Sequence, residues 1–354
     1  MSPIQRLILS VVALLPLAAQ AQAPAAAAPA QPHVVGIEFI GRMVANLDRS
    51  VAFYRAIGFA QDPLTNPVWR EDPVLERLYG AHGIQSRMAK MFINSNISGK
   101  RFVVYLREVK GIRRRNLSGH TAWDPGSTHF GLVVADAEAL WSELRAKGLL
   151  HPRSWDGKLV PFPGETQGGL AYITDPDGLD IEIINQRPAV PAAEGRPARA
   201  AVPPGVSHVG LIVLDSDKAC AFYGDLFGGQ LQSQSAPWMK GDFTDSVVGG
   251  HGNVLRFHNE AFAEVQAPAS HMNLELVEFQ NRKKPVEKSS ITDIGLGYVG
   301  FEVQGLDAFL ERVRAAGAKM VSAGIATMKS GTRVVMVRDP DVGMYIELFE
   351  QPRT

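Results

Sequence analysis

The chain of 354 residues has a single cysteine and no excess of charge of either sign. One cysteine excludes an internal disulfide framework and any metal site built from several thiolates. The 36 Lys and Arg residues balance 36 Asp and Glu residues, which argues against nucleic acid as a partner because such surfaces need a basic excess. There is also no uninterrupted apolar run of 18 residues, so we expect no membrane span. Any metal site must therefore use histidine and carboxylate side chains.

The N-terminus has the pattern of an export signal. Arg6 precedes a mainly apolar stretch of 13 residues, 7–19, which is too short to cross a bilayer and typical of a secretory signal peptide. Ala19-Gln20-Ala21 fits the small-x-small cleavage rule. We therefore predict a signal peptide over 1–21 and a periplasmic or secreted mature protein that begins at Gln22.

Two Ala/Pro-rich segments divide the rest of the chain. Residues 22–32 cannot build a core and are expected to form a tether. Residues 188–204 have the same composition and read as a linker. The sequence thus predicts two modules, 33–187 and 205–351.

The two modules are copies of each other. The segment LDRSVAFYRAIGF at 47–59 returns as SDKACAFYGDLFGG from Ser216, and HFGLVVADAEALWSELRAKG from His129 returns as YVGFEVQGLDAFLERVRAAG from Tyr298. In both cases the repeat lies 169 positions later. The closing segments AYITDPDGLDIEI and VVMVRDPDVGMYIEL also correspond. Segments repeated in one order at near-constant spacing indicate an internal duplication.

Each module shows a smaller period of strand, helix and further strands. Strand-like segments lead to Asp-containing helix starts, and Gly148 and Gly317 close the later helix of each module. The DPDG and DPDVG segments are turns between two strands. Each module therefore reads as two such units.

These motifs resemble the vicinal oxygen chelate superfamily, which includes glyoxalases, extradiol ring-cleaving dioxygenases and bleomycin-resistance proteins. The resemblance covers roughly 33–187 and 205–351. It implies an α+β fold of two tandem modules, each a pair of βαβββ units that form cup-like half-barrels. It also implies that divalent-metal ligands on the strands line the cup.

The histidine ligand positions of this superfamily are only partly filled. The first-strand histidine is His208 in the second module, whereas Phe39 occupies the position in the first. The fifth-strand histidine is His129 in the first module, whereas the second has Tyr298.

The glutamate positions are filled unevenly as well. The closing strands carry Glu182 and Glu347, one in each module. The remaining glutamate position has Glu275 as its candidate in the second module, with Glu278 as a rival on the opposite face of the strand. Its counterpart in the first module is Tyr105 or Leu106, depending on a slip of one residue.

Two pairings of half-modules follow from the resemblance. If each module forms its own site, as in ring-cleaving dioxygenases, neither has the two histidines and one carboxylate that a non-haem iron oxygenase needs. If half-modules are exchanged, as in glyoxalases, one site collects a complete set: His129, Glu182, His208 and Glu275. The other site keeps Phe39, Tyr105 or Leu106, Tyr298 and Glu347, and we expect aromatic side chains to fill it and no metal to bind there. This sorting favours the shared site.

The shared site implies one divalent metal ion, with Ni, Zn, Co, Mn and Fe not distinguished by ligand type. The first hypothesis is a glyoxalase-like isomerase or lyase that acts on a small substrate with vicinal oxygens through an enediolate, with Glu182 and Glu275 as catalytic carboxylates. Glyoxalase substrates are cytosolic glutathione adducts, so the predicted export favours another such substrate. The alternatives are an extradiol-type dioxygenase of an aromatic compound and a non-catalytic small-molecule-binding protein. Two fused modules allow a monomer to hold the shared site.

Overall fold

The computed structural model describes residues 31–63, 65–97, 100–163, 168–187, 201–235, 238–261, 272–282 and 288–352. The predicted signal peptide over 1–21, most of the tether and most of the 188–204 linker lie outside these ranges. Residues 32–354 form one unit by their contacts. Among the described residues, no helix combines the length and the apolar character that a membrane crossing needs.

Each module consists of two similar halves, as the repeat predicts. In the order of the chain, the elements of the first module are β1 (His33–Val44), α1 (Leu47–Ala56), β2 (Ala60–Gln61), β3 (Asn66–Glu71), α2 (Pro73–Tyr79), β4 (Gln85–Asn94), β5 (Arg101–Lys110), β6 (Thr128–Val134), α3 (Ala137–Ala146), β7 (Val160–Pro161), β8 (Gly169–Thr174) and β9 (Asp180–Asn185).

The second module repeats this order with small additions. Its elements are β10 (Gly205–Val213), α4 (Ser216–Cys220) with a π-helical continuation (Ala221–Leu226), β11 (Gln230–Gln234), β12 (Met239–Lys240), α5 (Asp242–Val248), β13 (Val254–Ala261), β14 (Asn273–Phe279), β15 (Gly297–Gln304), α6 (Leu306–Ala315), β16 (Lys319–Met320), β17 (Ala326–Thr327), β18 (Arg333–Arg338) and β19 (Tyr345–Glu350).

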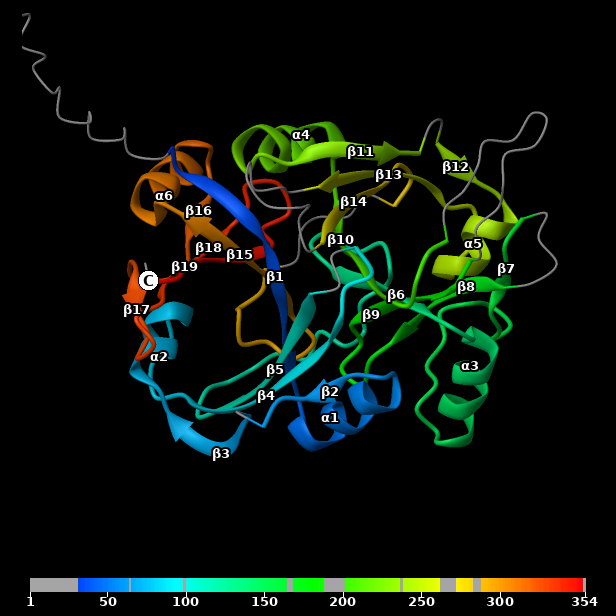
Figure 1. The fold of residues 1–354 in the computed structure, drawn as a ribbon, viewed down its shortest axis with the longest axis horizontal. Coiled ribbons are helices and arrows are strands. Elements are labelled where there is room, and N and C mark those ends of the chain that lie inside the picture. The colour runs from blue at the N-terminus through cyan, green and yellow to red at the C-terminus, as the bar shows by residue number, and fades with distance from the viewer. Residues whose placement is uncertain are drawn as a thin grey trace, which may run out of the picture. The chain divides into compact units, whose positions relative to one another are not determined.

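The strands form two sheets, and each sheet takes one half from each module (Figure 1). Sheet A has the order β16-β18-β19-β15-β1-β5-β4-β2, so the first half of module one joins the second half of module two. Sheet B has the order β11-β13-β14-β10-β6-β9-β8-β7 and joins the other two halves in a curled half-barrel. The joins are the antiparallel pairs β1–β15 and β6–β10. The half-modules are therefore exchanged.

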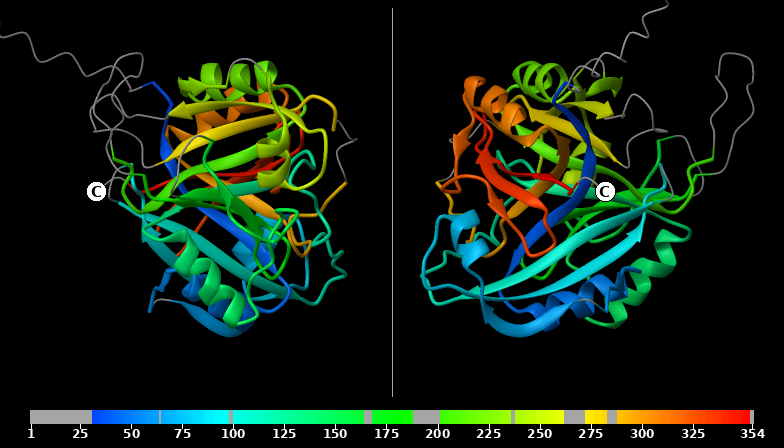
Figure 2. Two further views of the ribbon diagram at one scale, coloured as in Figure 1. Left: turned by 90° about the vertical axis from the view of Figure 1, so that its right-hand side faces the viewer. Right: turned by 60° about the vertical axis from the view of Figure 1, so that its left-hand side comes forward.

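The helices pack in pairs that belong to one module each. Figure 2 shows α1 beside α3 on one side of the sheets and α4 beside α6 on the other. Tyr54 of α1 reaches Phe130 of β6, with ring centroids 6.4 Å apart. Phe309 of α6 contacts Phe227, which follows the π-helical segment, edge to face at 5.2 Å. The two halves of a module thus pack through helices, whereas strand pairing joins halves of different modules.

Alternation along the strands separates the main core from the faces that carry the sites. Ile40 of β1 belongs to the largest hydrophobic cluster, whereas its neighbour Phe39 belongs to a second cluster on the opposite face of sheet A. Sheet B has a third cluster around Tyr172 and Ile212. Because side chains of a strand alternate between faces, one face of each sheet builds the main core and the other faces a cavity.

Candidate metal centre

The four predicted ligands lie on four adjacent strands of sheet B. His208 on β10 pairs in register with Gly131 on β6, which pairs with Glu182 on β9. One step along, His129 on β6 pairs with Gly210 on β10. Gly210 in turn pairs with Glu275 on β14. All four side chains therefore emerge on one face, in two neighbouring rows.

A glycine stands opposite each histidine and makes room for its ring. A β-carbon at Gly210 would lie 1.9 Å from Cε1 of His129, and one at Gly131 would lie 2.2 Å from Cε1 of His208. Such distances are sterically impossible, so any larger residue would displace the imidazoles. The histidine-x-glycine spacing of both strands, at 129–131 and 208–210, is the sequence signal for this arrangement.

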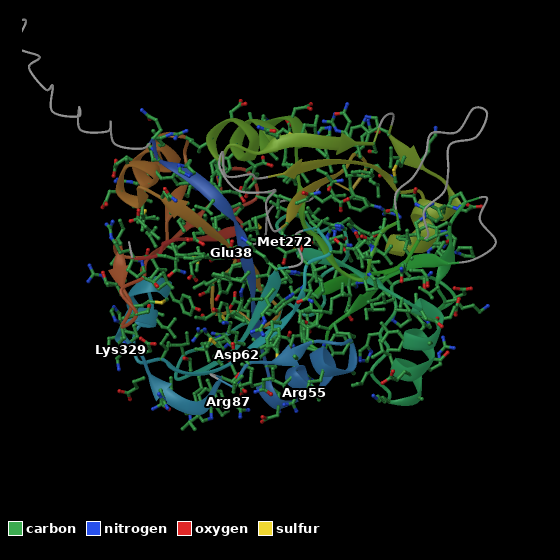
Figure 3. The ribbon with its side chains drawn as sticks, in the orientation of Figure 1. Glu38, Arg55, Asp62, Arg87, Met272 and Lys329 are labelled. Carbon is green, nitrogen blue, oxygen red and sulfur yellow. The ribbon has the colours of Figure 1, made fainter. Side chains whose placement is uncertain are left out.

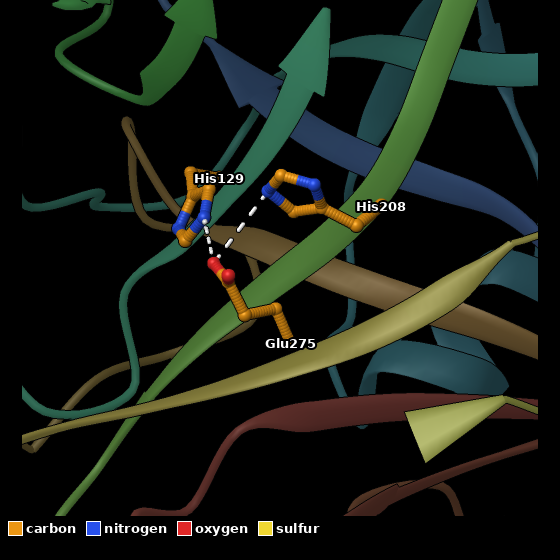
Figure 4. Close-up of side chains that lie close together, drawn as sticks. All are labelled: His129, His208 and Glu275. Atoms are coloured by element: carbon orange, nitrogen blue, oxygen red, sulfur yellow. Dashed lines mark hydrogen bonds and ion pairs between the residues drawn. The ribbon is translucent and has the colours of Figure 1, made fainter. Parts of the chain in front are cut away.

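Figure 4 shows how His129, His208 and Glu275 converge. Oε2 of Glu275 lies 3.1 Å from Nε2 of His129 and 3.5 Å from Nε2 of His208. One donor atom from each of the three residues lies within 4.8 Å of the others. Oε2 of Glu182 lies 3.2 Å from Nε2 of His208. The structure thus brings the three residues together and places Glu182 beside the second histidine.

Histidine and carboxylate groups shift one another's pKa values in this buried site. Burial lowers the pKa of His208, but Glu275 and Glu182 outweigh it and raise this pKa to about 9. Burial opposes ionisation of Glu275, but His208 and His129 hold its pKa below the ordinary value. Nε2 of His208 is buried and has no hydrogen bond of good geometry despite its carboxylate neighbours. Two carboxylates and a nitrogen without a partner therefore face the same space.

Sequence reasoning missed Tyr172 on β8. Its hydroxyl lies 3.1 Å from Nε2 of His129, and the two rings meet edge to face at 5.1 Å. Burial, together with Glu182 and Glu275, raises the pKa of Tyr172 well above its ordinary value, so the hydroxyl stays protonated. Tyr172 therefore orients the His129 ring. Its counterpart in the second module is Met336 of β18, which pairs with Glu347 as Tyr172 pairs with Glu182, so the repeat gives no sign of this role.

An elongated cavity of about 390 Å³ opens above the two glutamates. Its wall is mainly apolar and comes from strands of sheet B and from α5. Arg187 lines one end and stacks on Phe162, with its guanidinium carbon 4.4 Å from the ring centre. Other lining residues include Tyr172, Ile212, Phe243, Val247, Leu255, Phe257, Val277 and Phe279. The polar groups that could act on a bound molecule are concentrated at the end of the cavity that holds Glu182 and Glu275.

Sheet A has the same two-row layout with different side chains. Phe39 pairs with Gly300, which pairs with Glu347. Tyr298 pairs with Gly41, which pairs with Tyr105. The counterpart of Glu275 is thus Tyr105, and Leu106 points to the main core instead.

The expectation that aromatic side chains fill this second place is wrong. Phe39 does contact Tyr105 edge to face, with ring centroids 4.9 Å apart, and it stacks on Phe349 at 5.6 Å. A cavity of about 1110 Å³ nevertheless lies over these rings. Residues of β3, α2 and β4 line this cavity, although Leu75 and Leu78 of α2 also pack into the same hydrophobic cluster as Phe39.

Two family models match the chain. Both describe the glyoxalase/bleomycin resistance protein/dioxygenase superfamily, and they match residues 33–183 and 207–336. The chain belongs to this superfamily. The matches agree with the duplication and with the vicinal oxygen chelate motifs in each module.

Solved structures of glyoxalase I have a similar fold. Two variants of glyoxalase I from Zea mays are 19% and 18% identical, with TM-scores of 0.57 and 0.54. Each comparison covers 90% of this chain, and 93% and 94% of the maize chains. A putative dioxygenase from Bacillus subtilis is 13% identical over 91% of this chain and 86% of its own, with a TM-score of 0.48. A comparison with curated proteins gave no match.

Glu278, the rival of Glu275, has a structural role outside the superfamily's site. Its carboxylate accepts hydrogen bonds from the backbone and hydroxyl of Ser216 and forms an ion pair with Arg256, all at 2.9 Å. It lies on the face of β14 away from the cavity, as alternation requires. Glu278 therefore holds the start of α4 and is not near the metal-site residues.

Several arginine and aromatic side chains outside the site stabilise loops. Arg114 donates to three backbone carbonyls, of Thr292, Val109 and Val44, and Arg115 forms an ion pair with Asp293. Trp155 stacks on His251 at 4.1 Å, and neither residue lines the sheet-B cavity. These groups stabilise loops of the superfamily fold and do not contact the site.

Proposed function

We propose that sheet B holds one divalent metal ion through His129, His208, Glu275 and Glu182. Ligand bonds of about 2.0–2.2 Å place neighbouring donor atoms roughly 3–4.5 Å apart. The contacts of Glu275 and Glu182 with the histidine nitrogens, from 3.1 to 3.5 Å, fit that range. Nε2 of His208 faces the carboxylates of both Glu182 and Glu275, which supports the same assignment because one cation there would bind all three groups. Two neutral imidazoles and two carboxylates balance the charge of the ion.

We further propose that the protein is a glyoxalase-like isomerase or lyase. Bound at these residues, the ion would act as a Lewis acid for a substrate with two adjacent oxygens and stabilise the negative charge of an enediolate. Glu182, and with it Glu275, would take the proton from the carbon beside the carbonyl. The neighbouring histidines keep Glu275 ionised and therefore able to accept a proton. Tyr172 holds the His129 ring in place.

The cavity limits the substrate class. At about 390 Å³ it suits a small molecule, and its mainly apolar wall suits a substrate with an apolar portion next to its two oxygens. Arg187 also lines the cavity and would provide a positive charge for an anionic group of the substrate. The predicted export of the chain favours a substrate other than a glutathione adduct.

The dioxygenase alternative is less well supported. The paired strands gather two histidines and two glutamates from different modules, and neither module forms a site of its own from its two halves. A two-histidine, one-carboxylate iron site needs one carboxylate fewer. The isomerase or lyase proposal therefore rests on the exchanged half-modules and on the set of two histidines and two glutamates.

The test is metal loading of the full chain, followed by proton exchange. We expect one Zn²⁺ or Ni²⁺ per chain by elemental analysis, and at least about tenfold weaker binding in Glu182→Gln and His208→Ala. Glu347→Gln is the matched control, because Glu347 holds the equivalent position in sheet A, and it should bind metal normally. A chain that binds no metal would favour the non-catalytic binding protein instead.

The catalytic part is tested separately. The loaded protein should exchange the C–H hydrogen of dihydroxyacetone, a small 2-hydroxyketone, for deuterium from D₂O, as followed by NMR. Loss of the base lowers such rates by about 10²–10⁴-fold, so Glu182→Gln should exchange at a much lower rate at saturating metal. Equal exchange in wild type and Glu182→Gln would contradict the assigned role.

A further inference from the structure

The large cavity of sheet A has no role in the proposed reaction. It lies over the positions that correspond to the metal-site residues, but Phe39, Tyr105 and Tyr298 are not metal ligands. Among the described residues, the sheet-B trio is the group whose potential ligand atoms converge. At about 1110 Å³ the sheet-A cavity is larger than the sheet-B cavity, and it is lined by both polar and apolar side chains.

Arg107 carries a positive charge into this cavity. Its Nη1 donates to Oγ of Ser86 at 3.3 Å, and its Nη2 contacts Sδ of Met88 at 3.1 Å. Its Nε has no hydrogen-bond partner, and within the described part of the chain no carboxylate pairs with the guanidinium. Each Nη has a second N–H group, so the guanidinium retains donors for an anion. A charge in such surroundings is costly unless a counter-ion balances it.

The nearest structural candidate for a counter-ion does not neutralise Arg107. Glu347 lines the same cavity and is 6% exposed, but it forms no ion pair with Arg107 in the described structure. Burial raises the pKa of Glu347 to about 7, and the charge of Arg107 offsets only part of that effect. A substantial fraction of Glu347 is therefore protonated near neutral pH and can donate a hydrogen bond to a ligand.

Aromatic rings form the wall beside these two groups. Phe39 meets Tyr105 at 4.9 Å and Tyr298 at 6.2 Å, in both cases edge to face. A β-carbon at Gly300 would lie 2.2 Å from Cζ of Phe39, so the glycine keeps the ring flat against the sheet. A planar apolar ligand would pack favourably on such a wall.

The lining of the cavity carries charges of both signs. It includes Glu38 of β1, Arg87 of β4 and Lys329, which follows β17, and Figure 3 labels these residues on their different elements. Arg87 is already paired with Glu108 and Asp48. Arg107 lies two residues from Tyr105 on the same face of β5, so its guanidinium is a positive charge beside the aromatic wall. The Arg107 guanidinium supplies one positive charge, and the partly ionised Glu347 carboxyl lies in the same cavity. These two groups balance a singly charged anion better than a doubly charged phosphate.

We propose that the sheet-A cavity is a metal-independent binding site for a small aromatic monocarboxylate. Arg107 binds the carboxylate, and Phe39 and Tyr105 pack against the ring. The duplicated fold then has two sites of different chemistry, one for a metal-chelating substrate and one for an organic anion. The proposal stands whether or not sheet B is catalytic.

The test is calorimetry on the full chain with 2-naphthoate and its neutral analogue 2-naphthamide. We expect naphthoate to bind at least about tenfold more tightly than the amide, because a charge-assisted hydrogen bond distinguishes them. Arg107→Met should lose this preference and leave amide binding unchanged, whereas Glu182→Gln in sheet B should bind both as wild type does. Chelation of metal with EDTA should change neither affinity.

A second variant keeps the proposal testable if Arg107→Met does not fold. Glu347→Gln removes the acidic group next to Arg107, so at pH 8 it should bind naphthoate at least as tightly as wild type. Tenfold weaker binding in this variant would contradict the proposal. Equal affinities of wild type for naphthoate and naphthamide, or full naphthoate affinity in Arg107→Met, would overturn it.

Discussion

The ring of His129 lies directly across Gly210 of the neighbouring strand, where a β-carbon would be 1.9 Å from Cε1. We predict that Gly210→Ala displaces the ring, lowers zinc affinity at least about tenfold and costs about 1–3 kcal/mol of stability by overpacking. The control is Gly119→Ala, at a position where a β-carbon would meet no atom within 4 Å. Calorimetry and thermal unfolding measure both effects. Normal zinc binding in Gly210→Ala would refute the steric argument.

Substitutions of the two glutamates of β14 should have different effects: one should weaken metal binding and the other should lower stability. Glu275→Gln is expected to bind zinc at least about tenfold more weakly. Glu278→Gln breaks the buried pair with Arg256 and the contacts with Ser216, which should cost about 3 kcal/mol or more of stability but leave zinc affinity unchanged. Zinc titration and urea unfolding of both variants distinguish the roles. The interpretation fails if Glu278→Gln loses metal and Glu275→Gln does not.

Stability should fall as pH rises from about 4.5 to 7, and Glu347 should contribute to this fall. The pKa of Glu347 is about 7 in the folded protein against 4.5 for an ordinary glutamate, so the unfolded chain releases this proton first. The free energy of unfolding should therefore be larger below pH 4.5 than above pH 7. For Glu347 alone the difference is on the order of 3 kcal/mol. Urea unfolding across this range should show a shallower fall in Glu347→Gln. Identical pH profiles would exclude the shifted pKa.

Neither module should bind the metal ion alone. Residues 31–187 contain His129 and Glu182, and residues 201–352 contain His208 and Glu275, so each part holds half of the proposed ligands. Zinc titration should show binding only after the two purified parts are mixed and reassemble. Stoichiometric, tight zinc binding by either part alone would argue against a site shared between modules.

Export is predicted from residues that the structure does not describe. If the signal is cleaved as the sequence suggests, the protein from its native host begins at Gln22 and is found outside the cytoplasm. N-terminal sequencing of that protein decides the matter. A chain that still begins with Met1 or Ser2 would disprove cleavage.

The fold and the family could be predicted because duplicated motifs specify local structure and strand roles together. The resemblance to the superfamily indicated His129, His208 and the closing-strand glutamates as ligand candidates, and the repeat then aligned each position with its counterpart in the other module. The one-residue ambiguity between Tyr105 and Leu106 could not be resolved, because register depends on pairing between strands that are distant in sequence.

The open cavity in sheet A and the role of Tyr172 were beyond the sequence. Side-chain volumes at Phe39 and Tyr298 suggest a filled space, but the insert carrying α2 determines how much space remains, and its path is a tertiary property. Tyr172 approaches His129 only because β8 and β9 curl around the site. The sequence predicts an Asp at the helix starts, but α1 begins at Leu47 and its capping side chain is Asn46.

Joining the two modules in one chain has a genetic consequence. Were two identical chains to exchange halves, each substitution would appear in both sites at once, and every assembly would contain two copies of the same pocket. In the fused chain, a mutation in β1 or β15 alters the pocket of sheet A, and one in β6 or β10 alters that of sheet B. Each pocket is therefore free to evolve under its own selection, and the loss of both histidines from sheet A leaves the ligands of sheet B intact.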